Sequence, residues 1–162
     1  MTGADDLPTV YDSVVHMLAD AASRRPDAIA LTFGKTELTY GNYVRSVGRL
    51  ARRLQDLGAR GERVALVMGN SIDMSIAMFA VHAAGAQAVP INPLYTAREA
   101  GYILNDSAPV ATIHDSAATK LVSGLDDAGI LIEGGGTDFI DADDGRDAPL
   151  PTPAPDDLAT LQ

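Results

Sequence analysis

The stretch "RVALVMGNSIDMSIAMFAVHAAGAQAVPI", residues 63–91, is typical of a strand, a helix and a second strand in succession. Residues 63–68 are predicted to form a strand, in which 64–68, "VALVM", is an apolar run without alternating polar side chains, as in a strand that is covered on both faces. Asn70 is predicted to cap a helix over residues 71–84, and residues 86–91 are predicted to form the next strand. Two strands joined by one helix predict a parallel βαβ unit with a right-handed crossover.

The same alternation continues toward the C-terminus, and a different pattern precedes it. Residues 10–23 and 41–57 predict helices, the second capped by Thr39, and residues 29–40 predict a β-hairpin that turns at Gly34 and Lys35. The later elements are expected in the order helix 96–106, strand 110–115, helix 117–125 and strand 129–134. The predicted fold is α/β, with a mostly parallel Rossmann-like sheet flanked by helices on both faces and an N-terminal β-hairpin.

Charge is unevenly distributed along the 162 residues. The formal net charge is −10, and ten of the 22 acidic residues but only one of the 12 basic residues lie from position 126 onward. We expect residues 1–140 to form the α/β domain and residues 141–155 to be an acidic, proline-rich linker, solvated and without packing of its own. Residues 156–162 are expected to begin a further strand. Neither part has the basic patch that nucleic acid or an anionic membrane surface requires.

Several classes of protein are excluded by composition. The chain has no cysteine, so it has no disulfide and no thiolate metal site. The N-terminus lacks the features of a secretory signal, and no apolar run reaches the roughly 18 residues that a membrane span needs. We therefore expect a cytoplasmic protein without a membrane span.

Motifs that carry chemistry are scarce. The glycine-rich residues 132–138, "IEGGGTD", follow a strand and could cradle phosphate, but the acidic residues after them favour a flexible exit loop. Neither the dinucleotide-binding fingerprint nor the nucleotide-binding P-loop motif occurs. His16, His82 and His114 have no spacing that suits a metal site. The sequence therefore predicts no catalytic residue and no metal ligand.

The exit from the strand at residues 86–91 has a distinctive sequence, "AVPINPLYTARE", residues 88–99. Pro90 and Pro93 each lack an amide donor, so strand pairing stops there. Thr96 and Glu99 fit a capping box at the start of the next helix. Because open α/β sheets bind ligands at the carboxyl ends of their strands, the segment is either a rigid structural turn or part of a ligand-binding crevice.

Four motifs in a fixed order resemble the N-terminal part of the acyl-adenylate-forming enzymes, the AMP-binding superfamily. They are "ELTYGNYV" at 37–44, "GERVALVMGNS" at 61–71, "FAVHAAGAQAVPINPLYTARE" at 79–99 and "LNDSAP" at 104–109. Within this superfamily of acyl-CoA synthetases, luciferases and peptide-synthetase adenylation domains, "NPLYT" is most similar to fatty-acyl-CoA and aryl-CoA ligases. Asn42 is a departure, because the family commonly has glutamate there.

The resemblance implies an ATP-dependent acyl-CoA synthetase, which joins a carboxylic acid to AMP and then transfers the acyl group to coenzyme A. ATP, Mg²⁺ and coenzyme A are the cofactors it implies for the intact enzyme. The family's phosphate loop and later catalytic motifs would follow Gln162, so we expect an N-terminal fragment that is inactive alone and binds no cofactor tightly. Asn92, Pro93 and Leu94 are placed by the resemblance along the route of coenzyme A.

The expected partners are the rest of the ligase chain and, in the intact enzyme, the carboxylic-acid substrate. A subdomain on its own would also expose an apolar face and could self-associate through it. The alternative hypothesis is a stand-alone Rossmann-like binding or interaction module. A small intact enzyme is a weaker third hypothesis, since no nucleophile, base or metal cluster is apparent.

Overall fold

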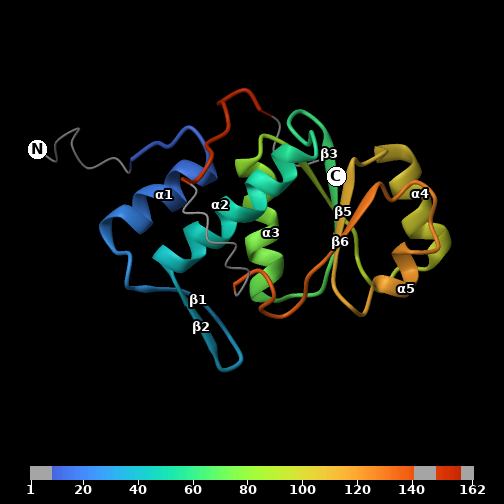
Figure 1. Ribbon diagram of the computed structural model, residues 1–162, viewed down its shortest axis with the longest axis horizontal. Helices are drawn as coiled ribbons and strands as arrows, with labels where there is room; N and C mark the ends of the chain where they lie inside the picture. Colours follow the sequence, from blue (N-terminus) through green and yellow to red (C-terminus); the bar gives the residue numbers. More distant parts are fainter. Residues whose placement is uncertain (1–8, 141–148, 158–162) are drawn as a thin grey trace, which may run out of the picture.

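The computed structural model describes residues 9–140 and 149–157, which form a parallel sheet between two layers of helices, with a hairpin beside it (Figure 1). The strands are β1 (Ile29–Phe33), β2 (Thr36–Thr39), β3 (Arg63–Val67), β4 (Gln87–Pro90), β5 (Ala111–His114) and β6 (Ile130–Glu133). The helices are α1 (Val14–Arg24), α2 (Tyr40–Asp56), α3 (Ile72–Ala83), α4 (Ala97–Ser107) and α5 (Thr119–Val122). The predicted fold class is confirmed.

The four parallel strands lie in the order β4-β3-β5-β6, and β1 and β2 pair separately as an antiparallel hairpin. The chain runs from β3 to β4 on one side and then returns to place β5 and β6 on the other side. The order therefore reverses between β3 and β5, which makes the carboxyl ends of these two strands the topological switch point.

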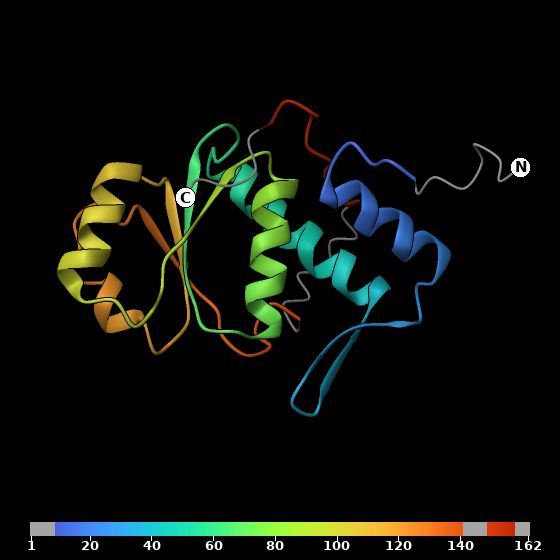
Figure 2. The ribbon, with the colours of Figure 1, turned by 180° about the vertical axis from the view of Figure 1, so that it is seen from behind.

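Strand β3 is buried on both faces. Val64 and Leu66 belong to the core beneath α2 and α3, whereas Ala65 and Val67 belong to the core beneath α4 and α5. All four side chains are fully buried. Figure 2 shows the two helical layers on opposite sides of the sheet, which explains why this strand has no polar alternation.

Four of the five helices begin at a hydroxyl side chain that accepts a hydrogen bond from the backbone amide three residues later. These residues are Ser13, Thr39, Ser71 and Thr96. The predicted cap Thr39 is confirmed. The predicted cap Asn70 is wrong, because Ser71 holds that position and its Oγ accepts from the Met74 amide at 3.0 Å. Both residue types are good caps, so the pattern alone could not separate them.

The capping box at the start of α4 is confirmed. The Thr96 amide and hydroxyl each donate to Glu99 Oε2 at 2.8 Å, and the Glu99 amide donates to Thr96 Oγ1 at 3.3 Å. Hydrogen bonds from the backbone amide and then the hydroxyl of Thr96 lower the pKa of Glu99. The box fixes the angle at which the chain enters α4 from β4.

Residues 149–157 lie against the domain, unlike the solvated linker expected from their composition. Arg52 Nη2 donates to the Pro149 carbonyl at 2.9 Å, and Leu150 packs against the core beneath α2 and α3. Arg60 forms an ion pair with Asp157 at 3.6 Å. Residues 141–148 and 158–162, which include most of the predicted linker and last strand, lie outside the described residues.

Gly129 precedes β6 at φ +64°, and a Cβ there would lie 2.4 Å from the Pro109 carbonyl oxygen. We expect Gly129→Ala to lower the free energy of unfolding by about 3 kcal/mol or more, because backbone atoms must move. Gly136→Ala is the matched control: φ is +76° but the space is open, so only backbone strain of about 1 kcal/mol is expected. Urea unfolding measures the free energy of unfolding of both variants. Equal losses in the two would contradict the role of the short distance between residue 129 and the Pro109 carbonyl.

The Thr96→Ala variant should lose about 1 kcal/mol of stability at pH 7, where Glu99 is ionised. Because the folded-state pKa of Glu99 lies below the unfolded one, the stabilisation from its carboxylate is present above its ordinary pKa of ~4.3. It is lost as the pH falls through the folded-state pKa. The difference in melting temperature between wild type and Thr96→Ala should therefore shrink from pH 7 to pH 3.

Thr39→Ala provides the control for this pH dependence. Thr39 accepts from the Asn42 amide at 3.3 Å, and the first turn of α2 has no acidic residue. Its loss of stability should stay constant over the same pH range. A Thr96→Ala difference that is equally constant would show that the hydroxyl of Thr96 gains nothing from the charge of Glu99, since the variant keeps the backbone amide that also binds this carboxylate.

Candidate functional site

The carboxyl ends of the parallel strands form the first candidate site, because they meet at the switch point between β3 and β5. Asp115, directly after β5, accepts from the Gly69 amide through Oδ2 at 2.8 Å and from the Ala118 amide through Oδ1 at 3.0 Å. A Cβ at Gly135, after β6, would lie 3.3 Å from the Asp115 Cβ. The carboxylate of Asp115 thus links the exits of β3 and β5 and occupies the position where many α/β proteins place a ligand.

The histidines do not combine into an acid–base or metal site. His114 is buried on β5, where Nδ1 lies 3.0 Å from the Asp115 carbonyl oxygen and 3.5 Å from Thr119 Oγ1. His16 lies on α1 beside the Ser13 hydroxyl, and His82 lies on α3. Across residues 9–140 and 149–157, no group of three or more His, Asp or Glu side chains could hold a metal ion. The three histidines thus lie on separate elements, α1, α3 and β5.

The glycine-rich loop after β6 packs back onto the domain. The Gly135 amide donates to Asp138 Oδ2 at 3.0 Å, and the Phe139 amide donates to Asp73 Oδ1 at 3.2 Å at the start of α3. Gly134 lies against the Phe139 ring, where a Cβ would come within 2.3 Å. The carboxylate of Asp138 already accepts the hydrogen bond of the Gly135 amide, and its negative charge disfavours phosphate at this loop.

The loop after β4 contains the three predicted site residues, and the structure places them together at the carboxyl end of an edge strand. Asn92 Oδ1 accepts from the Leu94 amide at 2.9 Å. The Ile91 amide still pairs with β3, donating to the Leu66 carbonyl at 2.9 Å. The side chain of Leu94 is 88% exposed. The loop is therefore held in a turn at one end and by the capping box at the other, and it presents Leu94 to solvent.

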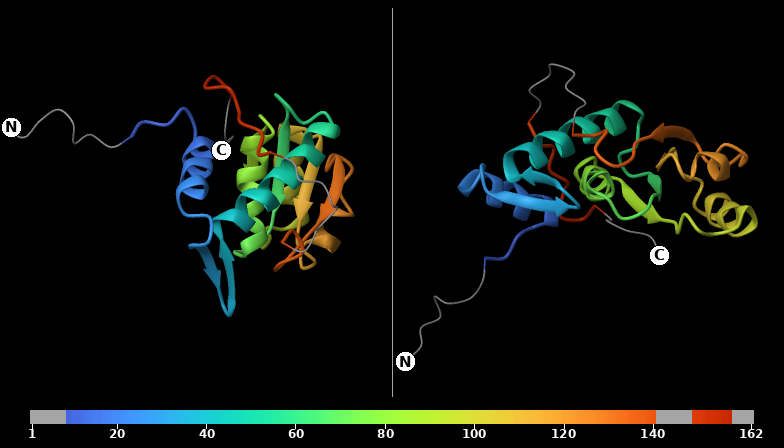
Figure 3. Two further views of the ribbon diagram at one scale, coloured as in Figure 1. Left: turned by 60° about the vertical axis from the view of Figure 1, so that its left-hand side comes forward. Right: turned by 90° about the horizontal axis from the view of Figure 1, so that it is seen from below.

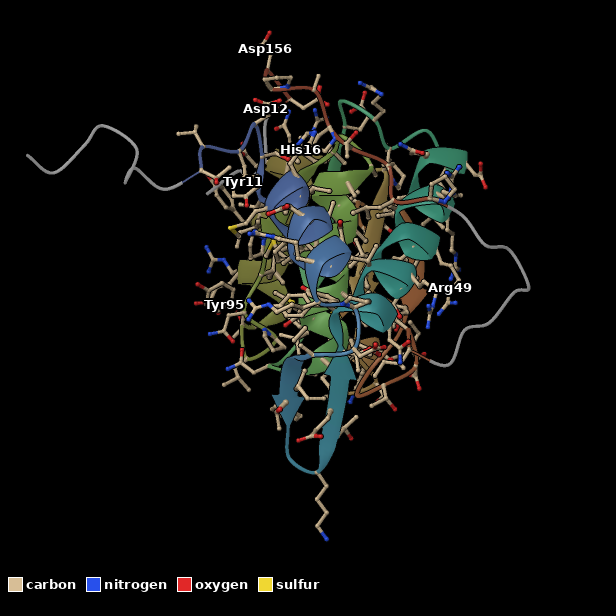
Figure 4. The ribbon with its side chains drawn as sticks, turned by 90° about the vertical axis from the view of Figure 1, so that its left-hand side faces the viewer. Tyr11, Asp12, His16, Arg49, Tyr95 and Asp156 are labelled. Carbon is tan, nitrogen blue, oxygen red and sulfur yellow. The ribbon has the colours of Figure 1, made fainter. Side chains whose placement is uncertain are left out.

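Tyr95, the next residue of this loop, lies on the opposite side of the molecule from Arg49 of α2 (Figure 4). The loop follows β4, an outer strand of the described sheet, and leads into α4.

An apolar groove is a second candidate site, which the sequence did not predict. It encloses about 520 Å³ between α1, β1, the start of α2 and α3. The side chains that line it are Met17, Leu18, Ala21, Ala30, Leu31, Tyr40, Tyr43, Met74, Ser75, Met78 and Phe79. The only signal in the sequence was the methionines, and apolar residues of this kind usually fill the core.

Tyr43 is the central polar residue of this groove. Its hydroxyl donates to the Ser75 carbonyl at 3.1 Å, and its ring meets Phe79 edge-on with centroids 5.6 Å apart. Burial raises the pKa of Tyr43 above its ordinary value, so the phenol stays protonated. It cannot act as a base at neutral pH. None of Asn92, Pro93 and Leu94 lines the groove, so the two candidate sites are separate.

No helix within the described ranges is long and apolar enough to cross a bilayer.

Comparison with known proteins finds one matching family and several similar solved structures. The sequence model of the AMP-binding enzyme family matches residues 18–162. The N-terminal domain of FACL13 from Mycobacterium tuberculosis is 29% identical with a TM-score of 0.74, covering 91% of this chain and 40% of that chain. A benzoate CoA ligase from Burkholderia xenovorans LB400 is 27% identical with a TM-score of 0.76, covering 90% of this chain and 31% of that one.

Among curated proteins, phosphinothricin tripeptide synthetase PhsC from Streptomyces viridochromogenes is 32% identical over 157 residues. The match covers 96% of this chain, which spans only 14% of the synthetase. The similarity therefore extends to ligases and to a peptide synthetase, and this chain spans less than half of each of these three proteins. The chain belongs to the AMP-binding enzyme family, and its fold is that of the N-terminal domain of adenylate-forming enzymes.

Proposed function

We propose that this chain serves as the N-terminal framework of an ATP-dependent acyl-CoA synthetase, which converts a carboxylic acid to its adenylate and then to a coenzyme A thioester. The structural likeness to FACL13 and to benzoate CoA ligase supports this assignment. The "NPLYT" sequence of the loop after β4 supports it further, through its resemblance to ligases of that kind.

The observation that carries the proposal is the exposed, fixed position of Leu94. Asn92 and Leu94 carry no charge, and neither does Pro93 between them, so the loop suits an uncharged part of a ligand and not a phosphate. The thiol-bearing arm of coenzyme A is uncharged and partly apolar. In the proposed role, Leu94 contacts this arm while the hydrogen bond between Asn92 Oδ1 and the Leu94 amide holds the turn.

The framework role follows from what the described residues contain. Asp115 is engaged by two backbone amides, and the described residues provide no group for Mg²⁺. ATP and Mg²⁺ would supply the adenylation chemistry, and in this proposal other parts of the enzyme hold them. This chain positions the loop after β4 and packs against the rest of the ligase.

A second candidate is the corresponding part of a peptide synthetase, where the activated acid would be an amino acid. The similarity to PhsC across nearly the whole chain favours it. The two candidates share adenylate formation and differ in the acid that is activated and in the thiol that receives it. The acceptor thiol is therefore the property to test.

A chimera provides that test, with residues 10–162 replacing the matching segment of the Burkholderia benzoate CoA ligase. We expect ATP–pyrophosphate exchange and benzoyl-CoA formation. Leu94→Glu should raise the KM for coenzyme A roughly five- to tenfold while leaving the exchange reaction unchanged, because only the second half-reaction uses the arm. Tyr102→Glu, on the exposed face of α4, is the control and should change neither.

Two results of the chimera experiment would count against the proposal. An unchanged KM for coenzyme A in Leu94→Glu would remove the role of this loop. A folded chimera without pyrophosphate exchange would contradict the framework assignment itself.

The 162-residue chain alone should form no acyl-adenylate. We expect background levels of pyrophosphate exchange with ATP, Mg²⁺ and either a panel of carboxylic acids or a panel of amino acids. The physical reason is that no group of three or more His, Asp or Glu side chains in the described residues could hold the metal ion. Release of acyl-AMP detected by mass spectrometry would contradict the prediction.

A further inference from the structure

Among the strands that the structure describes, β6 is an outer strand of the parallel sheet and pairs only with β5 (Figure 3). The Ile130 amide donates to the Val110 carbonyl at 3.0 Å, and the Gly134 amide donates to the His114 carbonyl at 2.9 Å. Alternate residues of a strand direct their peptide groups to opposite sides. The peptide groups of Leu131 and Glu133 therefore face away from β5, and within the described ranges nothing hydrogen-bonds to them.

The two edges of the sheet differ in protection. At β4, the Gln87 and Ile91 amides donate to β3, so Pro90 lies at an outward-facing position and removes a donor there. Strand β6 has the sequence Ile-Leu-Ile-Glu, without proline, lysine or a bulge. Proteins commonly block exposed edges with such features. The edge at β4 is thus closed to a further strand at this position, and the edge at β6 is open.

The open edge also exposes apolar side chains. Ile130 is 49% exposed and Leu131 is 38% exposed, while Ile132 between Leu131 and Glu133 is 1% exposed. Ile132 anchors the strand in the core beneath α2 and α3. Ile130 and Leu131 extend to opposite faces of the sheet, so an added strand would find an apolar neighbour on each face.

Carboxylates surround this edge. Asp126 and Asp127 precede β6, Glu133 ends it and Asp138 follows, and all four are exposed. The sequence from 121 to 145 contains no lysine or arginine. The ion pairs found in the described part of the chain use other carboxylates, those of Asp20, Glu62 and Asp157. The edge therefore has four exposed carboxylates and no basic side chain from its own segment. Arg49 of α2 reaches the end of the loop after β6, where it donates to the Ile140 carbonyl at 3.1 Å.

We propose that β6 binds an extended basic peptide segment, which adds to the sheet as a further strand. Its backbone would pair with the outward peptide groups of Leu131 and Glu133, and its lysine or arginine side chains would lie beside Glu133 and the aspartates that precede β6. This mode of binding obtains affinity from main-chain hydrogen bonds and specificity from side chains. It is independent of the proposed ligase function.

A second copy of this chain fits the edge less well. Antiparallel pairing of two β6 strands about a twofold axis would bring Glu133 of each copy toward Asp126 and Asp127 of the other. Like charges facing each other across strands are destabilising. The net charge of −10 on each copy adds repulsion. A basic partner removes both penalties.

The test uses the 162-residue chain and a fluorescein-labelled nine-residue peptide of alternating lysine and valine. We expect saturable one-to-one binding by fluorescence polarisation, weakened by added salt. By NMR hydrogen exchange, the Leu131 and Glu133 amides should exchange at least about tenfold more slowly in the complex. The Ile130 and Ile132 amides, which already face β5, should change less.

Matched controls separate strand addition from general attraction between charges. A peptide with glutamate in place of lysine should not bind. A lysine–valine peptide with N-methyl groups on alternate residues should no longer slow the hydrogen exchange of the Leu131 and Glu133 amides. Glu133→Gln should weaken binding several-fold, whereas Glu37→Gln, an exposed carboxylate of the hairpin, should not. Leu131→Pro removes the amide at position 131 and should abolish the slower exchange of the Glu133 amide. The N-methylated peptide tests the same contact without altering the fold.

Three outcomes would overturn the proposal. The first is absence of saturable binding, or equal binding of the acidic peptide. The second is binding that leaves the exchange of Leu131 and Glu133 unchanged, because the peptide would then sit elsewhere. The third is concentration-dependent dimerisation that protects the same two amides without peptide, because a second copy would then occupy the edge.

Discussion

The burial of β3 on both faces is the constraint on which the other elements depend. Side chains 64 to 67 alternate between two separate cores, and none of them touches water. Burial of a valine or leucine side chain contributes roughly 1.5–3 kcal/mol, so neither helical layer can be removed without exposing half of this strand. Helices α2 and α3 must cover one face and α4 and α5 the other, which in turn requires right-handed crossovers on both sides of β3.

The switch point that this topology creates is occupied by the chain itself. Asp115 uses both carboxylate oxygens to bind the amides that follow β3 and β5, the amides that elsewhere could receive an anion. In the proposed function, a ligand therefore contacts the loop after β4 and not this position. That loop presents the exposed side chain of Leu94, which suits apolar contact and positioning, not charge stabilisation.

Local signals predicted the elements well, and long-range contacts account for what they missed. The apolar run of β3, the turn at Gly34 and the capping box at Thr96 each depend on residues within a few positions, so the pattern contained them. Ser71 and not Asn70 caps α3, because Ser71 is the last residue with extended backbone angles before the helix. The position of Asp115 against Gly69, 46 residues away, and the contact of Arg52 with Pro149 depend on the assembled fold. No periodicity encodes such contacts, nor the groove that three helices and a hairpin enclose together.

Rigidity is the property that makes the loop after β4 suited to a partner or ligand. An exposed leucine on a mobile loop would lose conformational entropy on binding, which offsets the gain from burying it. Here Pro93 fixes one backbone angle, the Asn92 side chain fixes the turn, and the capping box fixes the start of α4. Pro90 adds a further restriction, because it prevents a strand from pairing with the outward edge of β4 at that position and leaves the loop accessible. Pro90 therefore keeps a further strand away from the end of β4, where the loop begins. Strand β6 has no proline, which is why the proposed peptide is placed at that edge.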